Sequence, residues 1–515
     1  MSDFCIIGSG PSAISAAVAL TRRNVRVTML DAGRTLEPSR AETVTRLSAH
    51  PPAEWSAADV QRLKEGVAAS ADGIPTKRLY GSDFAFRTEG SELDFDYANA
   101  GLRPGFAQGG LSNVWGAGML PFHRDDMADW PFDAAELDEG YRGVLSFVPC
   151  SGVKDALDDL FPNHSTNVQS LPPGRQGQAF LNDAERSRAS LARHGIVAGQ
   201  SRLAVQGHSC ERCGMCLYGC PYELIYNSAF TLRQLRKLPN FHYEPGFVVD
   251  RLDEKNGSVQ IDGHDLETQK PRHFESDRVL LGAGVIPSTA ILLNSLGHFD
   301  VKIRIQDSFY FLLPLLRLEG MSGVDRENLH TLAQAFVVMR DPAVCAEFVH
   351  FSIYGYNDLM IPSLKASIGA AGGMNALASR VLVAGGYLHS KFSPGLWMTV
   401  QPGSVHLEGE DSADAIAVAR RAAMKLLRQS ARLRAMPLIP AIRFPPPGRG
   451  FHAGGTFPMS RDPRRHMSDI DGRPHGFDRV HLIDASCLPS IPATPITLPV
   501  MANAWRIANR ASEYP

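Results

Sequence analysis

The N-terminal region alternates between short apolar runs and polar turns in a pattern typical of a strand–helix–strand unit. Residues 3–7 form a continuous apolar run, which predicts a buried parallel strand. The alanine-rich stretch after it predicts a helix that ends near Arg23, and the sequence VRVTML predicts a second strand leading to Asp31. This order of elements predicts an α/β fold with a Rossmann-like parallel sheet.

A different pattern occupies the middle of the chain. The segments AFVVM, EFVHFSIYGY, RVLVAGGYLHSKF and LWMTVQPGSVHLEG are rich in aromatic and β-branched residues, alternate in polarity and end at turn residues. Such segments predict an antiparallel sheet. Residues 413–433 place apolar side chains on one face and basic side chains on the other, which predicts an amphipathic helix.

Composition and charge narrow the class of protein. The chain has 515 residues, of which 44% are hydrophobic and 21% charged, enough for a globular protein of two or three domains. The formal net charge of −2 does not indicate binding to nucleic acid or to an anionic membrane. No apolar run approaches the roughly 20 residues of a membrane span. The N-terminus lacks the features of a signal peptide, and scattered cysteines favour the reducing cytoplasm.

The turn after the first predicted strand carries a Gly8-x-Gly10-x-x-Ala13 motif, with Ser12 inside it. Gly8 permits the tight turn, Gly10 lets a pyrophosphate approach the backbone, and Ala13 keeps the helix close to the strand. Asp31 follows at the distance where an acid accepts hydrogen bonds from an adenosine ribose. These residues predict a dinucleotide site, and their place at the N-terminus favours FAD.

Three further motifs are GGLSNVWGAGMLPF at 109–122, FHAGGTFPM at 451–459, and RVHLIDASCLPSIPATPITLPVMANAWRIANR at 479–510. With the N-terminal unit, they resemble the glucose-methanol-choline (GMC) oxidoreductase family. The resemblance implies an FAD-binding domain assembled from discontinuous segments, residues 1–299 and 446–515. It also implies an inserted substrate domain at 300–445, whose antiparallel sheet and helix wall the active site.

The resemblance further implies which residues contact the FAD. They are Gly109, Gly110, Ser112, Asn113, Trp115, Gly116, Val248, Val249, Gly282, Ala283, Asp484, Ala485 and Thr497. Some relatives attach FAD covalently through a histidine of the glycine-rich loop. The nearest position here is Asn113, so we expect noncovalent FAD.

Oxidation of an alcohol by a flavin needs a base beside the hydroxyl group. His452 matches the catalytic histidine of the family, and a neutral imidazole accepts a proton near pH 7. Most relatives place a second His or Asn at the site, in a segment that here is PATPIT. The equivalent is Thr494 or its neighbour Ala493, and a threonine hydroxyl cannot act as a second base.

Four cysteines, Cys210, Cys213, Cys216 and Cys220, are spaced C-x2-C-x2-C-x3-C and precede a proline. This is the spacing of bacterial ferredoxins, so we predict an iron–sulfur cluster. All four thiolates would bind a 4Fe–4S cluster, or three would bind a 3Fe–4S cluster or a 4Fe–4S cluster with an outside ligand. A structural cysteine loop, as in some GMC relatives, and a zinc site are the alternatives, and disulfides are disfavoured.

The leading functional prediction is an FAD-dependent dehydrogenase that oxidises an alcohol such as a sugar or polyol. Bacterial FAD-dependent sugar dehydrogenases resemble this combination of motifs. Electrons would leave through the cluster to an external acceptor protein or a quinone. The alternatives are a cluster-free alcohol oxidase that forms hydrogen peroxide, and a non-catalytic flavoprotein that carries electrons or responds to redox state.

Overall fold

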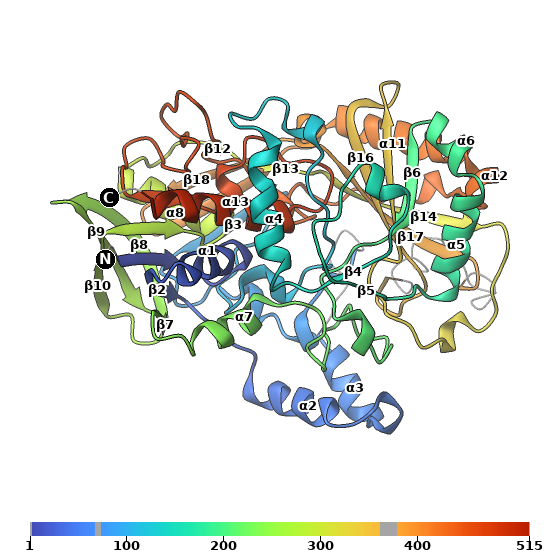
Figure 1. Cartoon of the computed structure of the whole chain (residues 1–515), viewed down its shortest axis with the longest axis horizontal. Helices are drawn as coiled ribbons and strands as arrows, with labels where there is room; N and C mark the ends of the chain where they lie inside the picture. Colours follow the sequence, from blue (N-terminus) through green and yellow to red (C-terminus); the bar gives the residue numbers. More distant parts are fainter. Residues whose placement is uncertain (1–2, 67–73, 361–377, 514–515) are drawn as a thin grey trace.

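The structure is a computed structural model that describes residues 3–66, 74–360 and 378–513. Figure 1 shows two regions side by side, with both chain ends in the same one. The first region contains the parallel sheet and the long C-terminal helix. The second contains a large antiparallel sheet with helices on its outer face, and the helices α2 (Pro38–Ser48) and α3 (Ala57–Lys64) project from the body.

The parallel sheet has five strands in the order β22-β11-β1-β2-β7. They are β22 (Val480–Leu482), β11 (Arg278–Leu281), β1 (Asp3–Ile7), β2 (Arg26–Asp31) and β7 (Phe241–Pro245). Neighbouring strands are parallel throughout and come from three distant parts of the chain. The prediction of a Rossmann-like sheet built from discontinuous segments is therefore confirmed.

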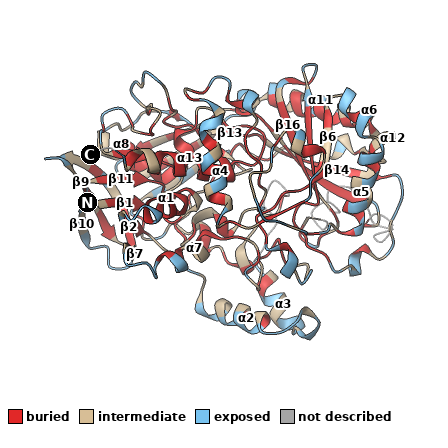
Figure 2. Cartoon of the chain, viewed as in Figure 1, coloured by how far each residue is buried: buried red, intermediate tan, exposed pale blue. Residues whose placement is uncertain are grey.

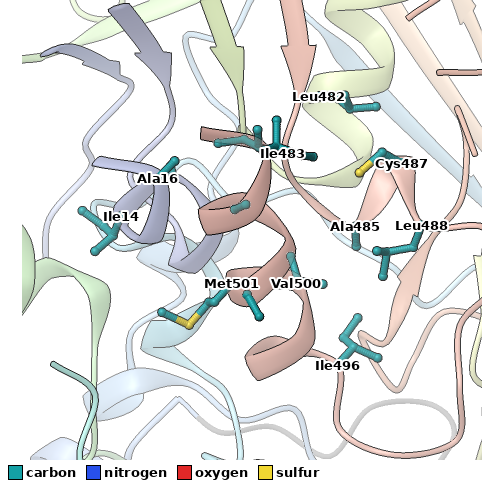
Figure 3. Close-up of a cluster of buried hydrophobic side chains, with 14 of the residues drawn as sticks. Ile14, Ala16, Leu482, Ile483, Ala485, Cys487, Leu488, Ile496, Val500 and Met501 are labelled. Carbon is teal, nitrogen blue, oxygen red and sulfur yellow. The ribbon is translucent and has the colours of Figure 1, made fainter. Parts of the chain in front are cut away.

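Two helices from opposite ends of the chain pack on this sheet and on each other. Helix α1 (Pro11–Arg22) begins with proline at its first turn, where the missing N–H group costs no hydrogen bond. Its small side chains let α13 (Thr497–Ala511) approach closely, and the Ser15 hydroxyl donates to the Met501 carbonyl at 2.7 Å. Figure 3 shows Ile14 and Ala16 of α1 in the same buried cluster as Val500 and Met501 of α13.

The antiparallel sheet has six strands in the order β20-β14-β17-β16-β15-β6. They are β20 (Ala435–Pro437), β14 (Tyr310–Arg317), β17 (Val381–Leu388), β16 (Cys345–Tyr354), β15 (Ala335–Asp341) and β6 (Ile196–Gln200). The edge strand β6 comes from well before residue 300 and pairs with β15. The helices α5 (Arg175–Arg186), α6 (Arg188–Arg193), α11 (Ala413–Arg428) and α12 (Ser430–Leu433) cover its outer face, over a second hydrophobic core.

Two smaller sheets lie apart from the two large ones. The four-stranded sheet contains β12 (Ile303–Arg304), β18 (Leu396–Gln401), β19 (Ser404–Gly409) and β3 (Asp94–Ala98). Here β19 pairs in parallel with β3, so the segment at 396–409 lies outside the large antiparallel sheet. The three-stranded sheet contains β8 (Phe247–Lys255), β9 (Ser258–Asp265) and β10 (Pro271–Ser276). Gly246 separates β7 from β8 with a φ of 76°, a conformation that suits glycine.

Three further helices are α4 (Asp138–Leu145), α7 (Ser228–Leu235) and α8 (Val285–Leu296). Figure 2 shows that buried residues fill the interior of both regions, whereas α2 and α3 are largely exposed. Within the described ranges, none of the helices has the length and apolar character needed to cross a membrane.

Replacing Gly140 by alanine tests the packing of α4 against α13. Alanine favours a helix over glycine by about 1 kcal/mol. Its methyl group, however, would overlap the Ala502 carbonyl oxygen and lie 2.8 Å from the Ala502 Cα. Because overpacking costs about 1–3 kcal/mol, we expect a net loss of about 1 kcal/mol in the free energy of unfolding, measured in urea.

The matched control is Arg142→Ala, on the exposed side of the same helix. It should change the free energy of unfolding by less than about 0.5 kcal/mol. A Gly140→Ala protein as stable as the parent would contradict the close contact between the two helices.

Candidate active site

A cavity of about 410 Å³ lies between the parallel and the antiparallel sheets. Its lining begins at the turn after β1, continues through the loop at 109–118 and reaches β15, β16 and β17. Small-molecule and cofactor sites are commonly cavities of about 300–1,000 Å³. The cavity therefore has the size and the position expected of a cofactor and substrate site at the edge of a parallel sheet.

One end of the cavity is a cradle of backbone atoms. Gly8 has a φ of +94°, and a Cβ there would lie 2.7 Å from the Gly282 carbonyl oxygen, so only glycine fits. At Gly10, by contrast, an added Cβ would meet no protein atom nearer than the Gly110 Cα at 4.0 Å. The space beside Gly10 is open cavity at the N-terminus of α1, where unpaired N–H groups attract a phosphate. The cradle therefore fits a pyrophosphate.

Asp31 stands at the end of β2 and lines the cavity. Its carboxylate accepts hydrogen bonds from the Ser9 hydroxyl and from the Tyr243 hydroxyl, the latter at 2.9 Å. Burial raises the pKa of Asp31 to about 6, and the two hydroxyl donors oppose that shift. The Ser9 hydroxyl also accepts from the Gly109 N–H at 2.8 Å, so the acid is held to the glycine-rich loop.

The glycine-rich loop is held by its own polar side chains. The Asn113 amide donates to the carbonyls of Gln108 and Gly110 at 2.9 and 2.7 Å. Its oxygen accepts from the Asn227 amide at 2.8 Å. Asn113 therefore closes the loop on itself and does not line the cavity, which suits a structural role. The Trp115 indole donates to the Tyr226 carbonyl at 2.9 Å.

At the C-terminal side of the cradle, Asp484 holds the turn between β11 and α8. Its carboxylate accepts from the Gly284 N–H at 2.8 Å and from the Ser288 hydroxyl at 2.5 Å. It also accepts from the Ser486 N–H at 2.9 Å. Burial raises the pKa of Asp484, and these donors oppose the shift. The acid thereby fixes the backbone on one side of the cavity.

His452 lines the same cavity. The short strands β13 (Gln306–Asp307) and β21 (Ala453–Gly454) pair beside it, and its carbonyl accepts from the Ser308 N–H at 2.9 Å. Its ring stacks on Tyr387 of β17, with centroids 4.8 Å apart and planes inclined at 21°. Burial lowers the pKa of His452 to about 4, so the imidazole is neutral at pH 7.

The structure brings most of the predicted site residues to this one cavity. Those that line it are Gly8, Gly10, Ser12, Asp31, Gly110, Ser112, Trp115, Gly116, Val248, Val249, Gly282, Ala283, His452, Asp484, Ala485 and Thr497. Four predicted residues lie behind the lining: Ala13, Gly109, Asn113 and Thr494. Thr494 is completely buried, and its hydroxyl has no hydrogen-bond partner among the described residues.

Sequence reasoning missed several residues of the cavity wall. Ser9 and Tyr243 position Asp31, Tyr387 contacts His452, and Lys77 and Tyr354 line the cavity. Tyr354 and Tyr387 belong to predicted strands, but alternation of polarity does not show which strand residue faces a ligand. Ser9 lies inside the glycine motif, and its hydroxyl was the one feature in the sequence that could have indicated a role for one of these residues.

The four cysteines of the 210–220 loop surround one small cavity of their own, with His330 also in its lining. Burial raises the pKa of Cys213 to about 12 and that of Cys220 to about 11. No three of the cysteine sulfurs lie within 4.8 Å of one another. A zinc ion with thiolate bonds of about 2.3 Å would hold them closer than that. The iron–sulfur cluster stays a prediction.

This cysteine loop also touches the larger cavity. Leu217, between the third and fourth cysteines, lines that cavity. The Tyr80 hydroxyl donates to the Cys220 carbonyl at 2.8 Å, which holds the loop against the segment before it. Trp55, which precedes α3, stacks on Tyr222 at 5.8 Å.

Comparison with known proteins gives the class of this fold. Residues 444–504 match the C-terminal domain of the GMC oxidoreductase family. The structure is similar to pyridoxine 4-oxidase from Mesorbium loti, with a TM-score of 0.62, 15% identity and 100% of both chains covered. It is also similar to a formate oxidase variant from Aspergillus oryzae RIB40, with a TM-score of 0.63, 13% identity, and 99% and 98% of the two chains covered.

Another formate oxidase structure has a TM-score of 0.63 and 14% identity, over 99% and 98% of the two chains. The sequence comparison with curated proteins found no match. The chain thus has the fold of these oxidases, and residues 444–504 match the C-terminal domain of an oxidoreductase family.

A bulky side chain at position 10 should block the cofactor without disturbing the fold. We expect Gly10→Val protein to be folded but to retain less than about one tenth of the parent's FAD, because the side chain enters the open cradle. Absorbance of the purified protein measures the flavin, and circular dichroism measures the fold. A Gly10→Val protein that retains a full complement of FAD would place the pyrophosphate elsewhere.

Proposed function

We propose that the protein is an FAD-dependent oxidase that oxidises a hydroxyl group of a small molecule and reduces oxygen to hydrogen peroxide. The observation that carries the proposal is a neutral, partly buried histidine in the wall of a cavity that also contains a pyrophosphate cradle. The choice of oxygen as acceptor is supported by the structures of similar fold, which are oxidases by name.

FAD would be held by the glycine cradle, Asp31 and the 282–285 turn, and it supplies the acceptor for a hydride from the alcohol carbon. His452 receives the hydroxyl proton. Its Nδ1 atom is buried and has no hydrogen-bond partner among the described residues, so Nε2 is the nitrogen that a substrate in the cavity reaches. A neutral imidazole is the form that accepts a proton, and the dry surroundings of His452 keep it neutral.

Other residues fix the position of this base. Tyr387 stacks on one face of the imidazole, and the β13–β21 pair holds the backbone next to it. Thr494 lies behind the lining residue Pro495, so we assign its hydroxyl a supporting role. Among the described residues, His452 is the one histidine that lines the cavity, so we assign it as the base.

The second candidate is the dehydrogenase whose electrons leave through an iron–sulfur cluster. It is favoured by the cysteine loop, where four thiols border one small cavity. Leu217 of this loop lines the FAD cavity, so a cluster there would lie beside the flavin. In that case the acceptor would be an external protein or a quinone.

Replacing His452 by alanine should leave FAD bound and slow reduction of the flavin by alcohol about 100-fold or more. Stopped-flow absorbance under anaerobic conditions measures this step. Because the pKa of His452 is lowered to about 4, the base is neutral above that pH and is lost as the pH falls through it. The parent rate should therefore not decline from about pH 8 to about pH 6, where an ordinary histidine of pKa about 6.5 would begin to protonate.

His406→Ala is the matched control, since His406 is exposed on β19 and bonded to Asp96. It should reduce its flavin at the parent rate. Flavin reduction in His452→Ala as fast as in the parent would remove His452 from the mechanism.

The fate of the electrons is tested on protein purified without oxygen. For an oxidase, each alcohol oxidised should yield one hydrogen peroxide, and iron and acid-labile sulfide should be absent. Cys216→Ser should then have the same rate of reoxidation as the parent. Stoichiometric iron and sulfide, together with slow reoxidation of Cys216→Ser by a one-electron acceptor, would instead establish the dehydrogenase.

A further inference from the structure

The wall of the cavity contains a lysine whose charge has no acidic partner. The Lys77 ammonium donates to the Trp115 carbonyl at 2.7 Å, and it forms no ion pair with any described residue. The Lys77 side chain lines the cavity. One carbonyl satisfies one of its three N–H groups, so the other two are open to a ligand.

Lys77 belongs to the same end of the cavity as His452. The Arg449 guanidinium, three residues before His452, donates to the Ile74 carbonyl at 2.9 Å and to the Thr76 hydroxyl at 2.8 Å. These bonds hold the segment before Lys77 against the loop that carries the base.

Aromatic side chains surround this end of the cavity. Tyr354, on β16, has its hydroxyl 3.6 Å from where a Cβ of Gly116 would be, one residue after the carbonyl that binds Lys77. Tyr387 lies on the neighbouring strand β17, and Phe336 on β15 also lines the cavity. The walls beside Lys77 are therefore flat, largely apolar surfaces with hydroxyl groups on them.

The acids of the cavity lie elsewhere. Asp31 and Asp484 are the carboxylates in its lining within the described residues, and each is bound to donors around the cradle. Burial of the ammonium group lowers the pKa of Lys77 to about 8, and the nearby Cys216 and Cys220 thiols oppose the shift. The group is still mostly protonated at pH 7, so a cation faces the substrate end of the cavity.

We propose that Lys77 binds a carboxylate of the substrate, so that the substrate is an aromatic compound carrying both a hydroxymethyl group and a carboxylate. This inference rests on the proposed function for the role of His452. The ammonium would bind the carboxylate of the substrate. The walls formed by Tyr354, Tyr387 and Phe336 would contact its flat apolar ring. The hydroxymethyl group would face His452.

Binding to the oxidised, FAD-loaded protein tests the assignment. Benzoate and benzyl alcohol have similar shapes and differ in charge, and their binding can be followed by the change in flavin absorbance. We expect the parent to bind benzoate about 10-fold or more tightly than benzyl alcohol, the scale of a hydrogen bond to a charged group. Lys77→Met should lose this preference and keep its affinity for benzyl alcohol.

Two variants serve as controls. Lys302→Met removes the same charge from the surface, where Lys302 pairs with Glu408, and should keep the preference for benzoate. Lys77→Arg should restore at least part of it. In turnover, para-(hydroxymethyl)benzoate should show a KM raised about 10-fold by Lys77→Met, with little change in kcat.

Three results would overturn the proposal: no benzoate binding to the parent, equal binding of both ligands, or a preference that survives in Lys77→Met. A fourth contradicting result has two parts: the flavin spectrum of unliganded Lys77→Met differs from that of the parent, and the variant binds both ligands equally more weakly. In that case the Lys77 ammonium would interact with the flavin and not with the substrate. Because binding is measured without turnover, His452→Ala should still bind benzoate. Failure of the base assignment is thus separable from failure of the carboxylate assignment.

Discussion

The whole site depends on a close approach between backbone segments at the ends of three parallel strands. The Gly8 N–H donates to the Leu30 carbonyl at 2.8 Å, and the Gly282 N–H donates to the Ile7 carbonyl at 3.0 Å. Gly110 then meets Gly10 so closely that a Cβ on it would lie 3.0 Å from the Gly10 Cα. Side chains at these points would fill the space that a cofactor needs. The sheet, the glycine-rich loop and α13 are all arranged around this contact between backbone segments that carry no side chains.

The order of strands and helices in the N-terminal unit was predictable because adjacent residues determine it. The strand, glycine turn, helix and acid of the N-terminal unit follow one another directly, and β1, α1 and β2 form where the pattern places them. The pairing of strands that are distant in the sequence was not predictable in the same way. The strands β18 and β19 at 396–409 pair antiparallel with each other, yet β19 also pairs in parallel with β3, some 300 residues earlier. Likewise β6 becomes an edge strand of the large sheet although nothing near it in the sequence indicates this pairing.

The same distinction applies to the cavity. At its cofactor end, Gly10 and Asp31 could be named from the spacing of one short motif, and Asp484 from the resemblance to the GMC family. The substrate end is assembled from single residues on separate elements. Lys77 lies in an irregular segment and Tyr387 on a strand, and neither belongs to a motif. Only the fold shows that both face the same space as His452, because Lys77 and His452 are separated by most of the chain.

The strand order of the parallel sheet also bears on how the protein is made. The strand β11 pairs on one side with β1 and on the other with β22, and α1 packs on α13 at the far end of the chain. During synthesis the residues of α1 emerge long before those of their neighbour α13. The apolar faces of β1 and α1 therefore lack their native partners until β11, β22 and α13 have been made. The cofactor cradle needs Gly282 beside Gly8, so it cannot form before that distant segment has been synthesised.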